Sequence, residues 1–319
     1  MIGWKPDTPL LDPESSSAGQ RYGTNSGLSP ERISDTGNEQ SDRESGNKAS
    51  SIQKRILGRT RDTAESSWRP LLVVIILFIA WDIVARENWV AGYLLPAPGR
   101  VWNALLSSSG YLWKNTLITL YETVLGFVVA TIVGIISAAA IVSSKNTEKT
   151  LYPLLIFAQV IPKVAIAPLF VVWLGFGTSP KVLVAVLVAF FPVVVSSVSG
   201  FRSVNPDLLN LAAIMGSSKW KTFWKIRFPN ALPHIFSGLK VAGTLAVVGA
   251  VVGEFVGANS GIGYVLLTAN GNLDTPILYA GLFILSLIGA VVFLAVALLE
   301  HIFVPWQPSR RQPLGVSTY

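Results

Sequence analysis

The residues that most often carry out chemistry in proteins are scarce in this sequence. Among 319 residues there is no cysteine, and the two histidines are His234 and His301. Neither histidine has a partner at a metal-ligand spacing, so the inventory excludes a zinc cage, a thiol nucleophile and an iron–sulfur site. The phosphate-binding pattern Gly-x-x-x-x-Gly-Lys-Ser/Thr does not occur either. We therefore predict no catalytic residue, no metal site and no ATP hydrolysis by such a loop.

The remaining candidates are polar side chains inside long apolar segments. Lys163 directly follows Pro162 in the middle of one segment, and Gln159 lies one helical turn earlier. A charge at mid-membrane costs at least about 2.5–3.5 kcal/mol, so such residues commonly face a pathway. Gln159 and Lys163 are therefore candidate pathway residues. The alternative is structural: Pro162 and Pro168 break the helix, and Lys163 then reaches water or a carbonyl.

Glu254 is the third candidate pathway residue. It lies among Gly249, Gly253 and Gly257, whose four-residue spacing permits close contact between helices. Glu254 could line an outer gate, or it could cap and pair within the helix bundle, which is the alternative we favour. Lys240 is expected to extend to the membrane interface.

The elements that hold these residues are set by composition. Hydrophobic residues make up 51% of the chain and charged residues 13%, about half the charged fraction of an ordinary soluble domain. This excludes a soluble enzyme and predicts an all-α, polytopic membrane protein. The six predicted transmembrane helices lie at about 70–86, 116–142, 151–175, 181–201, 234–257 and 276–303.

The ends of the chain differ from this apolar part. Residues 1–66 are polar and mixed in charge, so we expect a disordered N-terminal tail. Residues 67–306 form the predicted transmembrane domain, and residues 307–319 form a C-terminal tail. Between the first two spans, residues 94–106 predict a turn followed by a short amphipathic helix.

The distribution of basic residues predicts the orientation in the cell (plasma or inner) membrane. Six spans place both termini on one side. Without the N-terminal tail, that side carries nine Lys and Arg, against four on the other side: Arg86, Arg100, Lys114 and Lys181. By the positive-inside rule, both termini are cytoplasmic. Glu122 and Asp82 lie near segment ends, and we assign them no special role.

The longest loop, residues 202–233, then lies in the cytoplasm. Leu208, Leu211, Ala212 and Met215 repeat at the spacing of one helix face, and Gly216 interrupts that helix.

Ser217 or Ser218 can cap a second short helix in this loop. That helix carries Trp220, Phe223 and Trp224, at least one of which we expect to pack on the protein's own helices. Pro229 and Pro233 are predicted to end it before the next span. The loop could lie on anionic lipid or dock a partner protein.

The loop resembles the "EAA" loop of ABC-importer permeases, which reads Glu-Ala-Ala, three residues, Gly, nine residues, Ile, one residue, Leu-Pro. Ala212, Gly216, Ile226 and Pro229 are in register with that motif. Asn210 stands where the motif has its Glu, so a salt bridge from that Glu to the ATPase would be missing here.

Three further stretches are similar to the nitrate/sulfonate/taurine-type permeases of the MetI-like superfamily, and most of all to the riboflavin and thiamine-pyrimidine branch. With the loop, the resemblance covers residues 70–304. The stretches are 94–98 (Leu-Leu-Pro-Ala-Pro), 162–170 (Pro-Lys-Val-Ala-Ile-Ala-Pro-Leu-Phe) with 173–177, and Gly253-Glu254 followed by Gly261-Ile262-Gly263-Tyr264.

The resemblance implies an ABC-importer permease subunit with a cytoplasmic coupling-helix loop. It would form a homodimer, dock ATP-binding subunits at Asn210, Ala212, Gly216, Ile226 and Pro229, and receive substrate from an extracytoplasmic binding protein. ATP would be bound by the partner subunit, and this chain would need no cofactor, contact membrane lipid and bind no nucleic acid.

The substrate implied by the branch is riboflavin or a thiamine pyrimidine precursor, with sulfonate, taurine or nitrate as the alternative. A third hypothesis belongs to another class, an ion-gradient-driven secondary carrier. Such a carrier would favour internal repeats and more intramembrane acids, and neither is evident in the sequence.

Overall fold

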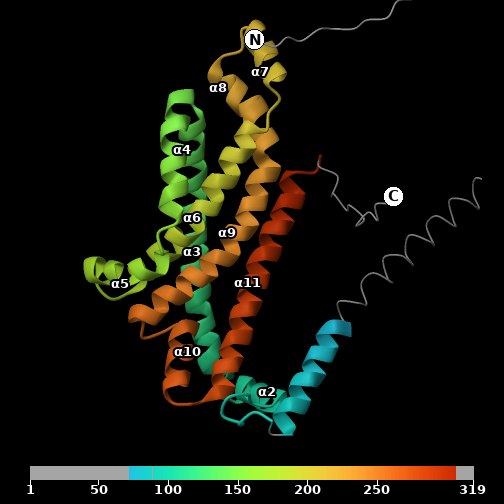
Figure 1. Ribbon diagram of the computed structural model, residues 1–319, viewed down its shortest axis with the longest axis vertical. Helices are drawn as coiled ribbons and strands as arrows, with labels where there is room; N and C mark the ends of the chain where they lie inside the picture. The colour runs from blue at the N-terminus through green and yellow to red at the C-terminus, as the bar shows by residue number, and fades with distance from the viewer. Residues whose placement is uncertain (1–71, 88, 307–319) are drawn as a thin grey trace, which may run out of the picture. The chain divides into compact units, whose positions relative to one another are not determined.

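The computed structural model describes residues 72–87 and 89–306 (Figure 1). Both predicted tails, residues 1–66 and 307–319, lie outside the described residues. Within the described ranges every regular element is a helix. The first helix occupies residues 72–86. The others are α2 (Pro98–Ser107), α3 (Ser109–Val142), α4 (Lys145–Gln159), α5 (Lys163–Leu174), α6 (Thr178–Arg202), α7 (Pro206–Ile214), α8 (Lys219–Thr222), α9 (Phe228–Gly257), α10 (Ile262–Gly271) and α11 (Thr275–Phe303), with a π-helical turn, Phe223–Arg227, between α8 and α9.

Four predicted spans are confirmed as long apolar helices. The helices Ser109–Val142, Thr178–Arg202, Lys219–Gly257 and Thr275–Phe303 are long and apolar enough to cross a membrane. The short helix expected near residues 94–106 is α2, which begins at Pro98, a residue whose fixed φ suits the first helical turn. The predicted first span, 70–86, begins outside the described residues, so the count of six spans stays a prediction.

The segment predicted as one span at 151–175 is instead two helices. The chain from Lys145 to Leu174 breaks between α4 and α5 and bends there by 89°, as the divergence of these helices in Figure 1 shows. Pro162 lies at the break with an extended backbone, because proline has no N–H to continue the helical hydrogen bonds and its ring crowds the preceding turn. Pro168, by contrast, lies inside α5 without ending it.

The prediction that Pro229 and Pro233 end the second loop helix is wrong. Lys219–Gly257 is one continuous helix that includes both prolines. The π-helical turn explains the continuity: the N–H of Phe228 bonds the carbonyl of Phe223, five residues back. The wider turn carries the helix to Pro229 in the first turn of α9.

Small residues hold the centre of the bundle together. The main core joins α3, α6, α9 and α11, and α6 and α9 make the most extensive contact. A Cβ built on Gly249 would lie 2.7 Å from the Cα of Ala185, and one built on Gly253 would lie 2.7 Å from the Cα of Lys181. The glycines therefore let α9 approach the backbone of α6, as their spacing predicted.

Replacing Gly249 by alanine is expected to destabilise the fold by about 1–3 kcal/mol, because the added methyl group meets backbone that cannot move aside. Gly289 in α11 is the matched control, since a Cβ there meets nothing within 4 Å. Thermal unfolding in detergent, followed by tryptophan fluorescence, should show a lower Tm for Gly249→Ala and not for Gly289→Ala. Equal Tm values for the two variants would contradict the close contact of α6 and α9.

Candidate functional site

The first candidate site is the α7–α8 segment, which we define as residues 205–227. Asn205 caps α7 by accepting a hydrogen bond from the N–H of Asp207 at 2.9 Å, and Ser218 caps α8 by accepting one from the N–H of Lys221 at 3.3 Å. The serine cap confirms the predicted start of the second helix. Each cap satisfies a backbone donor that the helix itself leaves free.

Gly216 ends α7 with the backbone geometry that only glycine adopts freely. Its φ is +72°, and no atom lies within 4 Å of a Cβ placed there. The N–H of Gly216 bonds the carbonyl of Ala213 at 3.0 Å, and the N–H of Ser217 bonds that of Ala212 at 2.9 Å. This pair of bonds is the Schellman motif, which fixes how the chain turns from α7 into α8.

The predicted apolar face of α7 is divided between burial and exposure. Ala212 is buried, whereas Leu208, Leu211 and Met215 are exposed, and Ile214 beside them is 83% exposed. Asn210 is exposed as well. A helix with several exposed large apolar side chains is suited to a groove in a partner protein.

The aromatic residues of the α7–α8 segment also divide into one that packs on the core and two that are exposed. Phe223 packs on Phe201 of α6, with ring centroids 5.3 Å apart, and joins the main core. This confirms the prediction that at least one of the three packs on the protein's own helices. Trp220 and Trp224 are exposed and meet edge to face at 5.6 Å.

The other two positions of the loop motif lie on the continuous helix beyond α8. Ile226 belongs to the π-helical turn, and Pro229 to the first turn of α9; both are half-buried. The structure thus places Asn210, Ala212 and Gly216 at the α7 end of the segment and these two at its junction with the bundle.

The candidate residues Gln159 and Lys163 meet at the break between α4 and α5. The Nζ of Lys163 donates to the carbonyl oxygen of Gln159 at 2.9 Å and lies 4.6 Å from the ring centroid of Phe191. The broken helix frees this carbonyl, as the structural alternative expected. The side chain of Gln159 is exposed, and a pathway role for the two residues stays a prediction.

Glu254 lies far from that break, in a buried network at the start of α10. Its carboxylate accepts hydrogen bonds from the hydroxyl of Thr119 at 2.6 Å and from the N–H of Gly263 at 2.5 Å. The hydroxyl oxygen of Thr119 accepts from the N–H of Ile262 at 2.8 Å, and the Oδ1 of Asn115 accepts from the N–H of Gly261 at 2.7 Å. Three side chains therefore satisfy the first donors of α10.

The glycines of the Gly261-Ile262-Gly263 stretch make this network possible. A Cβ on Gly261 would lie 2.1 Å from Oε1 of Glu254, and one on Gly263 would lie 2.6 Å from Oε2. Glu254 itself is fully buried, and a carboxylate at a helix N-terminus is favoured by the helix dipole. These contacts cap α10 and pair Glu254 within the bundle, and a pathway role for Glu254 stays a prediction.

Sequence reasoning missed the most deeply buried ion pair, between Glu122 of α3 and Lys181 of α6. The two side chains are 0% and 5% exposed, and Nζ lies 2.6 Å from Oε1. Glu122 had no assigned role, and Lys181 was counted among the charges outside the membrane. A signal was present: Asn115, Thr119 and Glu122 repeat at helical spacing in an apolar segment and form a polar stripe on one face of α3.

Lys240 of α9 has an acidic partner, and its extension to the membrane interface stays a prediction. It forms an ion pair with Glu300 of α11, and the two side chains are 25% and 27% exposed. In the part of the chain that the structure describes, no group of three or more His, Asp or Glu residues could hold a metal ion.

The structure is a bundle of membrane-length helices with the capped, apolar helix α7 at one end. Known proteins are similar to this chain. The family described as "binding-protein-dependent transport system inner membrane component" matches residues 130–305. A chain of the inward-facing MetNI methionine ABC transporter shares the fold, with a TM-score of 0.50 and 16% identity over 61% of this chain and 95% of that one.

Curated permeases are similar over most of their length. A formylaminopyrimidine transport permease protein of Halalkalibacterium halodurans is 37% identical over 75% of this chain and 95% of its own. A riboflavin transport system permease protein of Chloroflexus aurantiacus is 36% identical over 80% and 97%, respectively. A probable ABC transporter permease protein of Haemophilus influenzae is 36% identical over 74% and 96%.

Permeases named for aliphatic sulfonates, taurine and nitrate match at 31%, 28% and 27% identity. These matches favour the resemblance over the hypothesis of an ion-gradient-driven carrier. The chain belongs to the family of binding-protein-dependent inner membrane transport components and is a MetI-like permease subunit of an ABC importer.

Proposed function

We propose that this permease imports a small heterocyclic nutrient, riboflavin or a thiamine pyrimidine precursor. The observation that supports this most is the identity of 37% and 36% to permeases named for formylaminopyrimidine and riboflavin. Permeases named for sulfonates, taurine or nitrate share less identity and supply the alternative substrates.

The charges in the described spanning helices fit an uncharged or weakly charged substrate. Lys181 and Lys240 each pair with a glutamate. Lys163 bonds a backbone carbonyl and lies over an aromatic ring, a contact that partly compensates a cation. None of these three lysines is left to form a basic cluster for a strongly anionic substrate such as a sulfonate.

In the proposed importer, two copies of this chain form the pathway, with Gln159 and Lys163 facing it. Both termini and the α7–α8 segment lie in the cytoplasm, where basic residues concentrate. An ATP-binding subunit binds the exposed face of α7, which carries Leu211 and Ile214. A binding protein delivers substrate on the other side. A helix seated in a partner's groove can move the span that follows it as a rigid body.

The experiment is gentle affinity purification of the intact chain from its native membrane, with the co-purifying proteins identified and counted. We expect one ATPase per permease. The binding protein of the same system is then titrated with riboflavin, formylaminopyrimidine, taurine and nitrate. Binding of only taurine or nitrate would overturn the substrate proposal. Uptake that persists without ATP while an ion gradient is held would overturn the ATPase-driven mechanism.

A further inference from the structure

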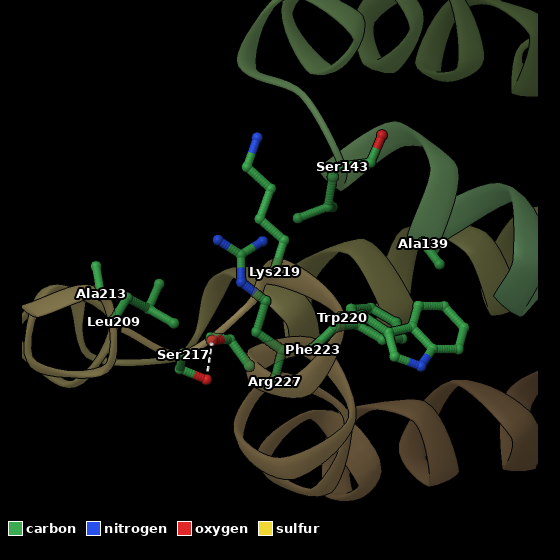
Figure 2. A pocket seen from close by; sticks show the side chains of 11 residues that line it. Ala139, Ser143, Leu209, Ala213, Ser217, Lys219, Trp220, Phe223 and Arg227 are labelled. Carbon is green, nitrogen blue, oxygen red and sulfur yellow. Dashed lines mark hydrogen bonds between the residues drawn. The ribbon is translucent and has the colours of Figure 1, made fainter. Parts of the chain in front are cut away.

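A pocket of about 470 Å³ separates the end of a spanning helix from the α7–α8 segment. One wall is the last turn of α3, with Ala139, Val142 and Ser143. The opposite walls come from α7, α8 and the π-helical turn. Figure 2 shows Trp220 directed toward Ala139, and Lys219 and Arg227 extending to the same side of the pocket.

The pocket lies at the end of the apolar helix α3, which ends at Val142. From that position we infer that it is at the level of the membrane interface rather than mid-membrane. Trp220, which lines the pocket, is 71% exposed. Tryptophan is enriched at the membrane interface. A ligand in this pocket would meet lipid headgroups on one side and acyl chains on the other.

Two basic residues also line the pocket, which is otherwise mostly apolar. Lys219 and Arg227 line it, and Lys221 and Lys225 lie between them in the sequence. No acidic residue occurs from 208 to 253, and none of the salt bridges among the described residues involves any of these four cations. The positive charge is thus available to an anion from outside the chain.

An exposed apolar strip continues from the pocket along α3. Ile136 and Ile132 lie on the same face as Ala139 and Ser143, one and two turns further into the span, respectively, and both are exposed. Basic residues at the interface above an exposed apolar strip complement a molecule with an anionic head and a long apolar tail.

We propose that this pocket binds one anionic phospholipid. Lys219 and Arg227 hold the phosphate, Trp220 and Phe223 contact the glycerol region, and an acyl chain follows Ile136 along α3. A bound lipid would fix α7 relative to α3. Its effect on transport rests on the proposed function, whereas the lipid site itself does not.

The test is native mass spectrometry of the delipidated full-length permease titrated with phosphatidylglycerol or phosphatidylcholine. We expect one phosphatidylglycerol to bind about tenfold more tightly than phosphatidylcholine, as two basic contacts to an anionic lipid would give. The double variant Lys219→Gln/Arg227→Gln should lose this preference. The charge-matched control Lys221→Gln/Lys225→Gln, whose residues do not line the pocket, should keep it.

Three outcomes would overturn the proposal. An equal loss in both double variants would mean unspecific attraction to basic charge. Full competition by inorganic phosphate would mean a site for a free anion. Binding to the permease alone but not to its complex with the ATPase would assign the pocket to the protein partner.

Ala139→Phe, which fills the pocket and keeps every charge, should also abolish binding. Because no arm measures uptake, failure here leaves the proposed transport function standing.

Discussion

Replacing Glu122 by leucine is expected to destabilise the permease by about 3–5 kcal/mol, the usual loss when one partner of a buried ion pair is removed. Lys181 would be left between α3 and α6 with its side chain 5% exposed and without the carboxylate that now lies 2.6 Å away. Thermal unfolding in detergent measures the loss as a lower Tm.

Two controls identify the unpaired lysine as the cause. The double variant Glu122→Leu/Lys181→Met removes both charges, and we expect it to recover most of the lost stability. Glu300→Leu breaks the pair with Lys240, whose side chains are about one quarter exposed. Water can then solvate the lysine, so the loss should be much smaller. If Glu122→Leu and Glu300→Leu lower the Tm equally, Lys181 reaches water and the buried pair is not formed.

The spanning helices were predictable because length and hydropathy alone set them. A run of about 20 apolar residues has few alternatives to a transmembrane helix, and α3, α6, α9 and α11 all follow such runs. The two-helix loop was equally accessible, since its apolar spacing, its glycine and its capping serine are local signals.

Proline effects were predicted less well, because they depend on the turn around each proline. Pro162 lies at a break of 89°, whereas Pro229 and Pro233 lie within a continuous helix. The difference is the π-helical turn before Pro229, in which Phe228 bonds Phe223. Nothing in the local sequence distinguishes these two cases.

The polar contacts between helices could not be read from spacing along the chain. Glu122 and Lys181 are 59 residues apart, and Thr119 and Glu254 are 135 apart. Their pairing follows from the register in which α3, α6 and α9 pack. The polar stripe on α3 and the acid among the glycines of α9 are visible in the sequence, but only the packing determines which residues pair and buries them.

The second large effect is expected at Gly216. Substitution by valine should reduce uptake to background while leaving membrane insertion and Tm nearly unchanged. The φ of +72° costs an L-residue about 1–2 kcal/mol, and a β-branched side chain tolerates it least. The turn at residue 216 therefore relaxes away from this conformation and changes the orientation of α7 relative to α8. Stability should change little because the site is open and no atom lies within 4 Å of the new Cβ.

Uptake by proteoliposomes that contain the ATPase and the binding protein measures the effect, and the ratio of co-purifying ATPase to permease shows whether docking fails. Gly216→Asn is the matched control, since asparagine adopts positive φ more readily than other residues and should retain most uptake. Equal activity of the valine and asparagine variants would mean that the turn does not set the docking geometry. A valine variant that loses ATPase while its Tm holds would separate a docking function from a folding one, because the Schellman turn joins two helices whose exposed faces contribute little to the core.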